Sequence, residues 1–224
     1  MIKTKKPVKK MNKSKKETKV KKSEAKKPEE KIKKVEDVIL KIAIEIAKHG
    51  EGALFIIGEN IHYAHLIKHK MKRVSVFEKG AEKLLKGLAV IDGAVIINPK
   101  GSLVDYGVLI KNTSPYFGYG TRHAAAITAS KKGNIAILVS EEERKVKVFK
   151  DGKYIMQIDA LQKNVAKRVS TISELLESTG VGVIGTIGAA TLVPVLGITL
   201  IPGIIIFGGS YYAIKSLVER TGKK

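Results

Sequence analysis

Residues 88–97, LAVIDGAVII, decide the fold that the sequence predicts. Two short apolar runs, Leu88–Ile91 and Val95–Ile97, flank the tripeptide DGA at positions 92–94, which sets a carboxylate beside a glycine. Short apolar runs that are bounded by turn residues are typical of buried strands. The segment therefore predicts one strand that ends at a polar site and a second strand that leaves it.

A second polar string, GTRH at residues 120–123, follows about one supersecondary unit later. It aligns a hydroxyl, a guanidinium and an imidazole just before an alanine-rich segment, Thr121–Ser130, which we predict to be helical. A helix N-terminus favours anions, and a carboxylate can hold a divalent metal ion. The two strings together predict an enzyme that acts on a nucleoside triphosphate.

The surrounding pattern predicts an α/β domain over residues 35–177, in which helices flank a mixed β-sheet. The predicted helices are Val35–Lys48, Glu78–Lys86, Thr121–Ser130 and Ala160–Ser178, and Ile61–Lys72 is a polar helix or a loop. The predicted strands are Ala53–Ile57, Leu88–Ile91, Val95–Ile97, Leu103–Ile110, Ile135–Val139, Lys145–Phe149 and Lys153–Ile158. The last two form a hairpin around Asp151-Gly152.

The first 34 residues differ sharply from this domain. They hold sixteen lysines and four glutamates, so +12 of the net charge of +21 lies in them, and they contain no aromatic residue. Such a segment buries too little to offset its chain entropy, and we expect it to be disordered. The charge suits anionic lipid or nucleic acid, or the tail is a solvated extension without a specific partner.

Residues 178–214 contain no charged side chain over 37 positions and have basic residues on both flanks. A single helix of that length would be about 55 Å long, nearly twice the hydrocarbon core of a bilayer. We therefore expect a transmembrane hairpin that keeps both basic flanks, and the catalytic domain, on the cytoplasmic side of the cell membrane. The alternative is a buried or oligomer-forming segment that is rich in glycine.

Three strings, IDGAVII at 91–97, GTRHAAA at 120–126 and VSEE at 139–142, together resemble the diadenylate cyclase (DAC) domain family. The resemblance covers Val35 to about Gln162 and is closer to the membrane-bound branch than to the DNA-scanning branch. It implies a DAC-type fold and an enzyme that condenses two ATP molecules into cyclic di-AMP and two pyrophosphates.

The resemblance also implies a role for individual residues. The residues implied in catalysis are Asp92, Arg122 and His123, and those implied in binding Mn²⁺ or Mg²⁺ are Asp92 and Glu142. The residues implied in substrate binding are Gly93, Ala94, Leu109, Gly120, Thr121, Ser140 and Glu141. Because each ATP attacks the other, two sites must face each other across a two-fold axis, which implies a homodimer.

One position departs from the family pattern, which usually continues Arg-His-Arg where this chain has Ala124. The missing phosphate contact could come from Lys131 or Arg144. The departure motivates an alternative function, a membrane sensor or scaffold that binds ATP or cyclic di-AMP with little turnover. A third hypothesis is a nucleic-acid-binding protein that uses the lysine-rich tail.

A histidine cluster offers a weaker signal. His62, His65 and His69 recur at helical spacing, which suits metal ligands, but neighbouring lysines would oppose a cation. We therefore interpret these histidines as part of a solvated face.

Overall fold

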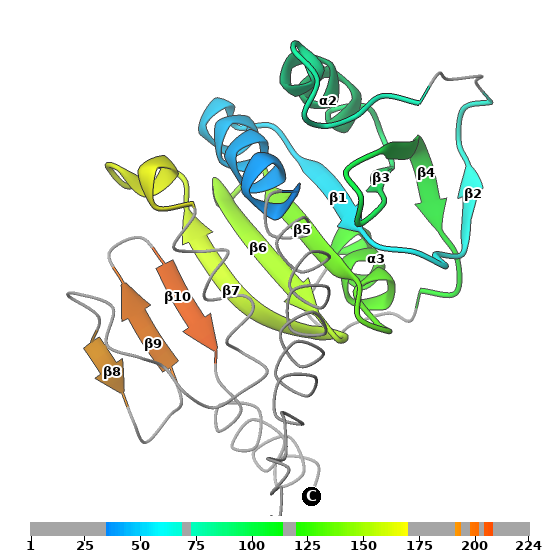
Figure 1. Ribbon diagram of the computed structural model, residues 1–224. Coiled ribbons are helices and arrows are strands. Elements are labelled where there is room, and N and C mark those ends of the chain that lie inside the picture. The colour runs from blue at the N-terminus through cyan, green and yellow to red at the C-terminus, as the bar shows by residue number, and fades with distance from the viewer. Residues whose placement is uncertain are drawn as a thin grey trace, which may run out of the picture.

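The computed structural model describes residues 35–68, 73–113, 120–169, 191–193, 198–201 and 204–207 (Figure 1). One helix covers residues 35–49. The others are α2 (Ala81–Ala89), α3 (Thr121–Ala129) and the 3-10 helix η1 (Val165–Arg168). The strands are β1 (Ala53–Ile57), β2 (Tyr63–His65), β3 (Ala94–Ile97), β4 (Leu103–Ile110), β5 (Ile135–Ser140), β6 (Lys145–Lys150), β7 (Lys153–Asp159), β8 (Thr191–Val193), β9 (Ile198–Ile201) and β10 (Ile204–Phe207).

These strands form one sheet in the order β2-β4-β3-β1-β5-β6-β7-β10-β9-β8. β1 and β3 run parallel to each other at its centre, whereas β1 pairs with β5, and β3 with β4, in antiparallel fashion. Every residue of β1 and β3 is buried, as expected of strands that are covered on both faces. A mixed sheet flanked by helices is therefore confirmed for the described residues.

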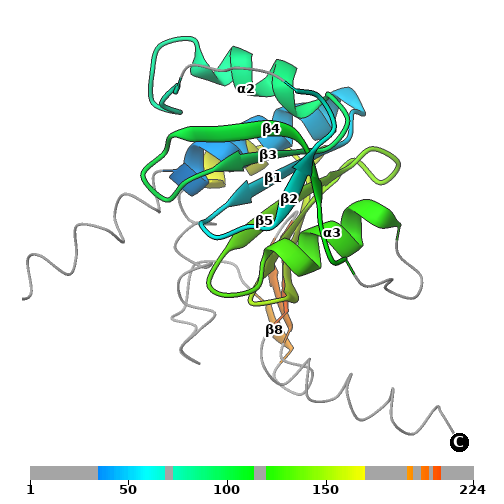
Figure 2. The ribbon, with the colours of Figure 1, turned by 90° about the vertical axis from the view of Figure 1, so that its right-hand side faces the viewer.

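The helices are divided between the two faces of the sheet (Figure 2). The helix at residues 35–49 and α2 cover one face, where Phe55 and Ile57 of β1 join a large apolar core. α3 covers the other face, where Leu54 and Ile56 of β1 pack in a smaller cluster with alanines of α3. Alternate residues of one strand thus serve two different cores.

The prediction of a strand at Leu88–Ile91 is wrong. α2 continues to Ala89, and residues 91–93 form the bend that leads into β3. The reason lies in the spacing of Ala81, Leu85 and Ala89, which are buried at helical intervals and keep one apolar face turned to the sheet. The predicted strand at Val95–Ile97 is confirmed as β3, which begins one residue earlier.

Two other segments differ from the prediction. Residues 61–72 contain the edge strand β2, which pairs with the C-terminal part of β4. Residues 69–72 lie outside the described residues. The predicted helix at Ala160–Ser178 begins instead with turns and the short η1, because Asn164 takes a left-handed backbone conformation. A regular helix starting at Ala160 is incompatible with that conformation.

The uncharged segment 178–214 does not form the expected transmembrane hairpin where the structure describes it. It contains β8, β9 and β10, and β10 pairs with both β7 and β9. Many residues of these strands are β-branched, which favours strands, and Pro194 and Pro202 disfavour a continuous helix. Among the described residues, no helix has the length and apolar character that crossing a bilayer requires.

The predicted tail at residues 1–34 and all of residues 170–190 and 208–224 lie outside the described residues. The domain boundaries at 35 and 177 therefore stay a prediction. The structure does add one fact, which is that β10 extends the sheet of the predicted catalytic domain beyond residue 177.

Candidate active site

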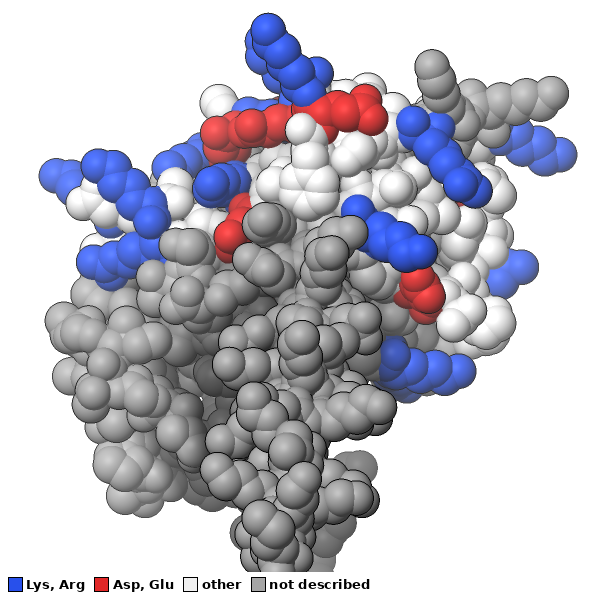
Figure 3. Space-filling view, in the orientation of Figure 1, with Lys and Arg blue, Asp and Glu red and all other residues white. Residues whose placement is uncertain are grey.

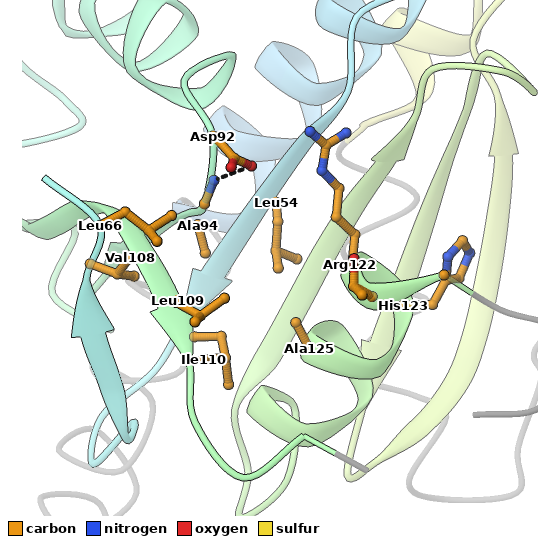
Figure 4. Close-up of a pocket in the computed structure, with 13 residues that line it drawn as sticks. Leu54, Leu66, Asp92, Ala94, Val108, Leu109, Ile110, Arg122, His123 and Ala125 are labelled. Carbon is orange, nitrogen blue, oxygen red and sulfur yellow. Dashed lines mark hydrogen bonds between the residues drawn. The ribbon is translucent and has the colours of Figure 1, made fainter. Parts of the chain in front are cut away.

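A cavity of about 550 Å³ opens between the start of α3 and the strands β1, β3 and β4 (Figure 4). This volume lies within the range of about 300–1,000 Å³ that is typical of small-molecule sites. The residues that line it are Leu54, Leu66, Asp92, Gly93, Ala94, Val108, Leu109, Ile110, Gly120, Thr121, Arg122, His123 and Ala125. The structure therefore brings the DGA and GTRH strings to the walls of one cavity.

Asp92 lies exposed at one wall, in the bend between α2 and β3. Its Oδ1 accepts a hydrogen bond of 3.0 Å from the Gly93 backbone N–H. Gly93 has a φ of +101°, and a Cβ there would lie 2.7 Å from the backbone nitrogen of Val108. Glycine is therefore required at this position by the close approach of β4 as well as by its backbone conformation.

The N-terminus of α3 forms the facing wall. The Gly120 carbonyl accepts hydrogen bonds from the backbone N–H groups of His123 and Ala124. Among the described residues no side chain caps the helix, and its first turn holds no acidic residue, so its dipole and the backbone N–H groups of Thr121 and Arg122 suit an anion. The exposed Thr121 adds a hydroxyl to this end of the helix.

Arg122 extends from α3 along β1 toward the end of the cavity that holds Asp92 (Figure 4). Its guanidinium passes Gly52, where a Cβ would lie 2.3 Å from Arg122 Nη1 and 3.6 Å from Glu141 Oε2. Gly52 thus leaves room for the arginine, and the predicted site residue Glu141 lies at the same place. In the sequence, Gly52 is only the residue before a predicted strand, so sequence reasoning did not identify it as the position that leaves room for the Arg122 guanidinium.

His123 takes a different direction from Arg122. Although it lines the cavity, its imidazole points away from Asp92 toward β6, where Nε2 lies 3.2 Å from Lys147 Nζ (Figure 4). The imidazole also packs edge-on against the Phe149 ring, with 6.2 Å between the two ring centroids. Burial, followed by the nearby Lys147 charge, lowers the pKa of His123 below its ordinary value, and Glu143 opposes part of this effect.

Lys147 and Glu143 are further residues of this region that sequence reasoning missed. Lys147 is only 4% exposed, and its Nζ donates a hydrogen bond to Glu143 Oε1. Burial raises the pKa of Glu143, but hydrogen bonds and charge from Lys147 and Lys145 outweigh it and lower the pKa overall. The alternation KVKVFK in β6 gives no sign that Lys147 is buried, because alternating polar residues are typical of the solvated face of a strand.

The two basic residues that we considered as substitutes for an arginine at position 124 lie elsewhere. Arg144 Nη1 donates to the Lys48 carbonyl, at the end of the helix at residues 35–49, where it satisfies one of the last carbonyls. The aliphatic part of Lys131 lies beside Gly152 in the β6–β7 turn. Ala124 itself is buried, and neither Lys131 nor Arg144 is among the residues that line the cavity.

Three more predicted site residues have distinct places. Leu109 is 55% exposed and lines the cavity, whereas Ser140 ends β5 and its Oγ accepts a hydrogen bond from the Glu143 N–H. Glu142 is exposed in the turn after β5 and is not among the residues that line the cavity. The role of Glu142 as a metal ligand stays a prediction.

The residues at the cavity fit a divalent metal ion that is held by one protein carboxylate together with the substrate. Within the described residues there is no group of three or more His, Cys, Asp or Glu side chains that could hold an ion. Mg²⁺, however, is commonly held by one or two carboxylates together with substrate phosphates and water. Asp92, exposed at the cavity wall opposite the N-terminus of α3, fits that arrangement.

The histidine cluster is not a metal site where it is described. His65 Nε2 lies 2.7 Å from Asp105 Oδ2, which ties β2 to β4. His69 lies outside the described residues. On the face shown in Figure 3, the described lysines and arginines are spread out, with acidic side chains between them. The hypothesis of nucleic-acid binding therefore rests on the tail and not on this face.

Comparison with known proteins identifies the cavity-bearing region. Residues 41–154 match the family model described as DisA bacterial checkpoint controller nucleotide-binding, DAC. The chain is 32% identical over 136 residues to a protein named diadenylate cyclase from Methanocaldococcus jannaschii, covering 54% of this chain and 44% of the relative. It is 30% identical over 141 residues to one of the same name from Haloferax volcanii, covering 54% and 51%.

The chain thus spans about half the length of the curated relatives it matches. Among solved structures, DacA from Staphylococcus aureus shares 19% identity with a TM-score of 0.40, over 70% of this chain and 97% of that one. The family match covers half of the chain and contains both cavity strings. This chain belongs to the DAC nucleotide-binding family.

Proposed function

We propose that this chain is a diadenylate cyclase, which condenses two ATP molecules into cyclic di-AMP and two pyrophosphates. The observation that carries the proposal is the cavity in which Asp92 lies opposite Arg122 and the N-terminus of α3, within a chain that belongs to the DAC family. The guanidinium and the helix N-terminus favour an anionic ligand, and the carboxylate can hold a metal ion. The cavity therefore suits a nucleoside triphosphate better than a neutral ligand.

The residues divide the chemistry between them. Each 3′-hydroxyl attacks the α-phosphorus of the other ATP, so that one P–O bond forms, the anhydride to the β-phosphate breaks, and pyrophosphate and a proton leave. Arg122 and the α3 N–H groups would neutralise the triphosphate, and Asp92 would lie near the attacking hydroxyl. A divalent ion, Mn²⁺ or Mg²⁺, would be held by Asp92 and by substrate phosphates and would supply further charge neutralisation.

The proposed reaction needs a homodimer, because one cavity holds one ATP and the product joins two. Three exposed apolar side chains, Leu66, Ile67 and Leu109, support a face-to-face partner. Leu66 and Leu109 line the cavity, and the Ile67 side chain lies beside Gly107 in the adjoining part of β4. Burial of this apolar rim by a second copy would close the site against water.

A product assay tests the proposal. Purified full-length protein is incubated with ATP and with Mn²⁺ or Mg²⁺, and cyclic di-AMP is measured by mass spectrometry. We expect product with the wild type and none with Asp92→Asn, which keeps the shape of the side chain. Glu82→Gln, a charge deletion at an exposed position of α2 away from the cavity, is the control and is expected to retain activity, whereas loss of product in Glu142→Gln would support Glu142 as a second metal ligand. Absence of product and of ATP binding under both metals would refute the proposal.

The alternative function is a nucleotide sensor with little turnover. The buried Ala124 favours it, because α3 carries one arginine fewer than the family pattern. Calorimetry distinguishes the two functions, since a sensor would bind ATP or cyclic di-AMP without forming product.

We also propose that the reaction takes place in the cytoplasm, where ATP is available. The lysine-rich tail would contribute only binding to anionic lipid or nucleic acid. Deletion of residues 1–30 should therefore leave product formation intact and abolish any salt-sensitive binding to nucleic acid.

A further inference from the structure

Lys147 is a buried cation close to the cavity, and its partners are unusual for a lysine on a strand. Its Nζ contacts Glu143 Oε1 and lies 3.2 Å from His123 Nε2, while the residue is 4% exposed. A buried ammonium is costly unless it is paired and hydrogen-bonded. The lysine therefore stays in this place because both partners hold it there.

The direction of the hydrogen bond follows from the chemistry of the two groups. A lysine ammonium only donates, so the nitrogen that faces it must offer a lone pair. Nε2 of His123 is consequently unprotonated, and the neutral ring carries its hydrogen on Nδ1. The edge-on contact with Phe149 restrains the plane of the same ring from a second side.

This arrangement bears on the first turn of α3. His123 follows Arg122 directly, and its backbone N–H donates to the Gly120 carbonyl. A ring held by Lys147 and Phe149 therefore fastens the turn that carries Arg122 against β6. The strand β6 in turn is paired along its whole length with β5 and β7, so that the anchor is a rigid one.

We propose that Lys147, clamped by Glu143, is a positioning residue that holds His123 as the Nδ1–H tautomer and thereby fixes the turn that carries Arg122. The consequence for catalysis rests on the proposed function. With Nε2 occupied by the lysine, His123 does not act as a general base through that nitrogen. The positive charge beside the helix end belongs to Lys147 and not to an imidazolium.

The first experiment observes the ring itself and needs no turnover. Full-length protein is labelled with ¹⁵N-histidine, and the resonances of His123 are assigned by comparison with His123→Gln. In the wild type at neutral pH we expect Nε2 to show the shift of an unprotonated nitrogen and Nδ1 that of a protonated one. A protonated Nε2 in the wild type overturns the proposal without any variant.

Two lysine variants then separate positioning from general structure. Lys147→Met removes the donor and keeps an unbranched apolar side chain, and we expect the His123 signals to shift toward a mixture of tautomers. Lys145→Met is the matched control, because Lys145 lies on the same strand and its Nζ lies 3.3 Å from Oε2 of the same Glu143 carboxylate. Unchanged His123 signals in Lys147→Met, or equal changes in both variants, overturn the proposal.

Activity provides the second readout. Misplacement of a binding group by a fraction of an ångström to 1 Å costs up to about 100-fold, so we expect kcat/KM to fall about tenfold or more in Lys147→Met. Lys147→Arg, which keeps a charged donor, should recover most of it, and Lys145→Met should match the wild type. If the proposed cyclase function is wrong, no sample forms product, including the wild type. The nitrogen shifts would still show whether Lys147 holds His123 as the Nδ1–H tautomer.

Discussion

The two faces of the central strands are covered in different ways. On one face, Phe55 and Ile57 of β1 pack against the helix at residues 35–49 and α2, in a core of large side chains such as Ile39 and Ile137. On the other face, Leu54 and Ile56 meet α3, whose buried residues are all alanines. Large side chains fill the first face, whereas small ones leave a cavity beside the second.

This difference suggests that stability and chemistry are located on opposite faces of the same strands. A close-packed core loses free energy with every deleted methylene, because the surroundings relax only in part. A cavity wall tolerates truncation better, because no closed void is created there. Substitutions on the two faces should therefore have opposite signatures, and the following predictions test that separation.

The largest effect on activity is expected from Arg122→Ala. Loss of one preorganised group that stabilises transition-state charge typically costs about 10²–10³-fold in kcat. Because Arg122 is exposed, the free energy of unfolding should change little, as chemical denaturation can show. Lys131→Ala, a charge deletion just beyond the other end of α3, is the control and should keep full activity. If Arg122→Ala lowered the free energy of unfolding as much as a truncation in the first core does, the separation of stability and chemistry between the two faces would be contradicted.

The largest effect on stability is expected from Ile137→Ala, in the first core. Ile137 is fully buried, and such truncations cost about 2–5 kcal/mol of the free energy of unfolding. Activity per folded molecule should stay close to that of the wild type. Leu54→Ala, on the cavity face of the neighbouring strand, should cost less stability and instead alter the KM for ATP. Urea denaturation and steady-state kinetics on both variants decide the matter.

Much of this arrangement could be predicted from the sequence, and the failures share a cause. The strands β1, β3 and β5 and the hairpin at Asp151-Gly152 were predictable because local apolar runs and turn residues specify them. The C-terminal end of α2 and the strand β10 were not, because an apolar residue such as Val90 or Ile204 suits a helix end, a strand or a lipid phase equally well. Only tertiary partners, the sheet for α2 and β7 for β10, choose between them.

The candidate site shows the same limit at the level of side chains. The positions of Asp92 and Arg122 on one cavity could be inferred because a motif names residue types in order. The opposite direction of His123 could not be inferred, because it depends on Lys147, a residue 24 positions away on another strand. Gly52 is a similar case, since its importance comes from the absence of an atom beside Arg122.

Two glycines provide a smaller and more precise test. A Cβ at Gly52 would lie 2.3 Å from Arg122 Nη1, the end of a flexible side chain, so Gly52→Ala should displace the guanidinium at little cost in stability. We expect kcat/KM to fall about tenfold to 100-fold. A Cβ at Gly58 would lie 2.1 Å from Oδ1 of the buried Asn134, which accepts a hydrogen bond from the Glu59 N–H. Gly58→Ala should therefore lower the thermal midpoint more than Gly52→Ala does, and activity per folded molecule less.

The smallest effect concerns pH, and it arises where the cavity face meets β6. Burial and Lys147 lower the pKa of His123 below 6.5, so the folded state disfavours the protonated ring. Below pH 6.5 the unfolded chain then binds more protons at this residue than the folded chain. The contribution of His123 to the free energy of unfolding is fully present above pH 6.5 and is lost as the pH falls through the folded-state pKa.

His123→Gln keeps an acceptor for Lys147 without this titration, so its free energy of unfolding should decline less steeply than that of the wild type between about pH 7 and pH 5. Urea denaturation at several pH values measures both slopes. Parallel slopes would mean that the ring is as easily protonated in the folded protein as in the unfolded chain, and that Lys147 does not hold it neutral.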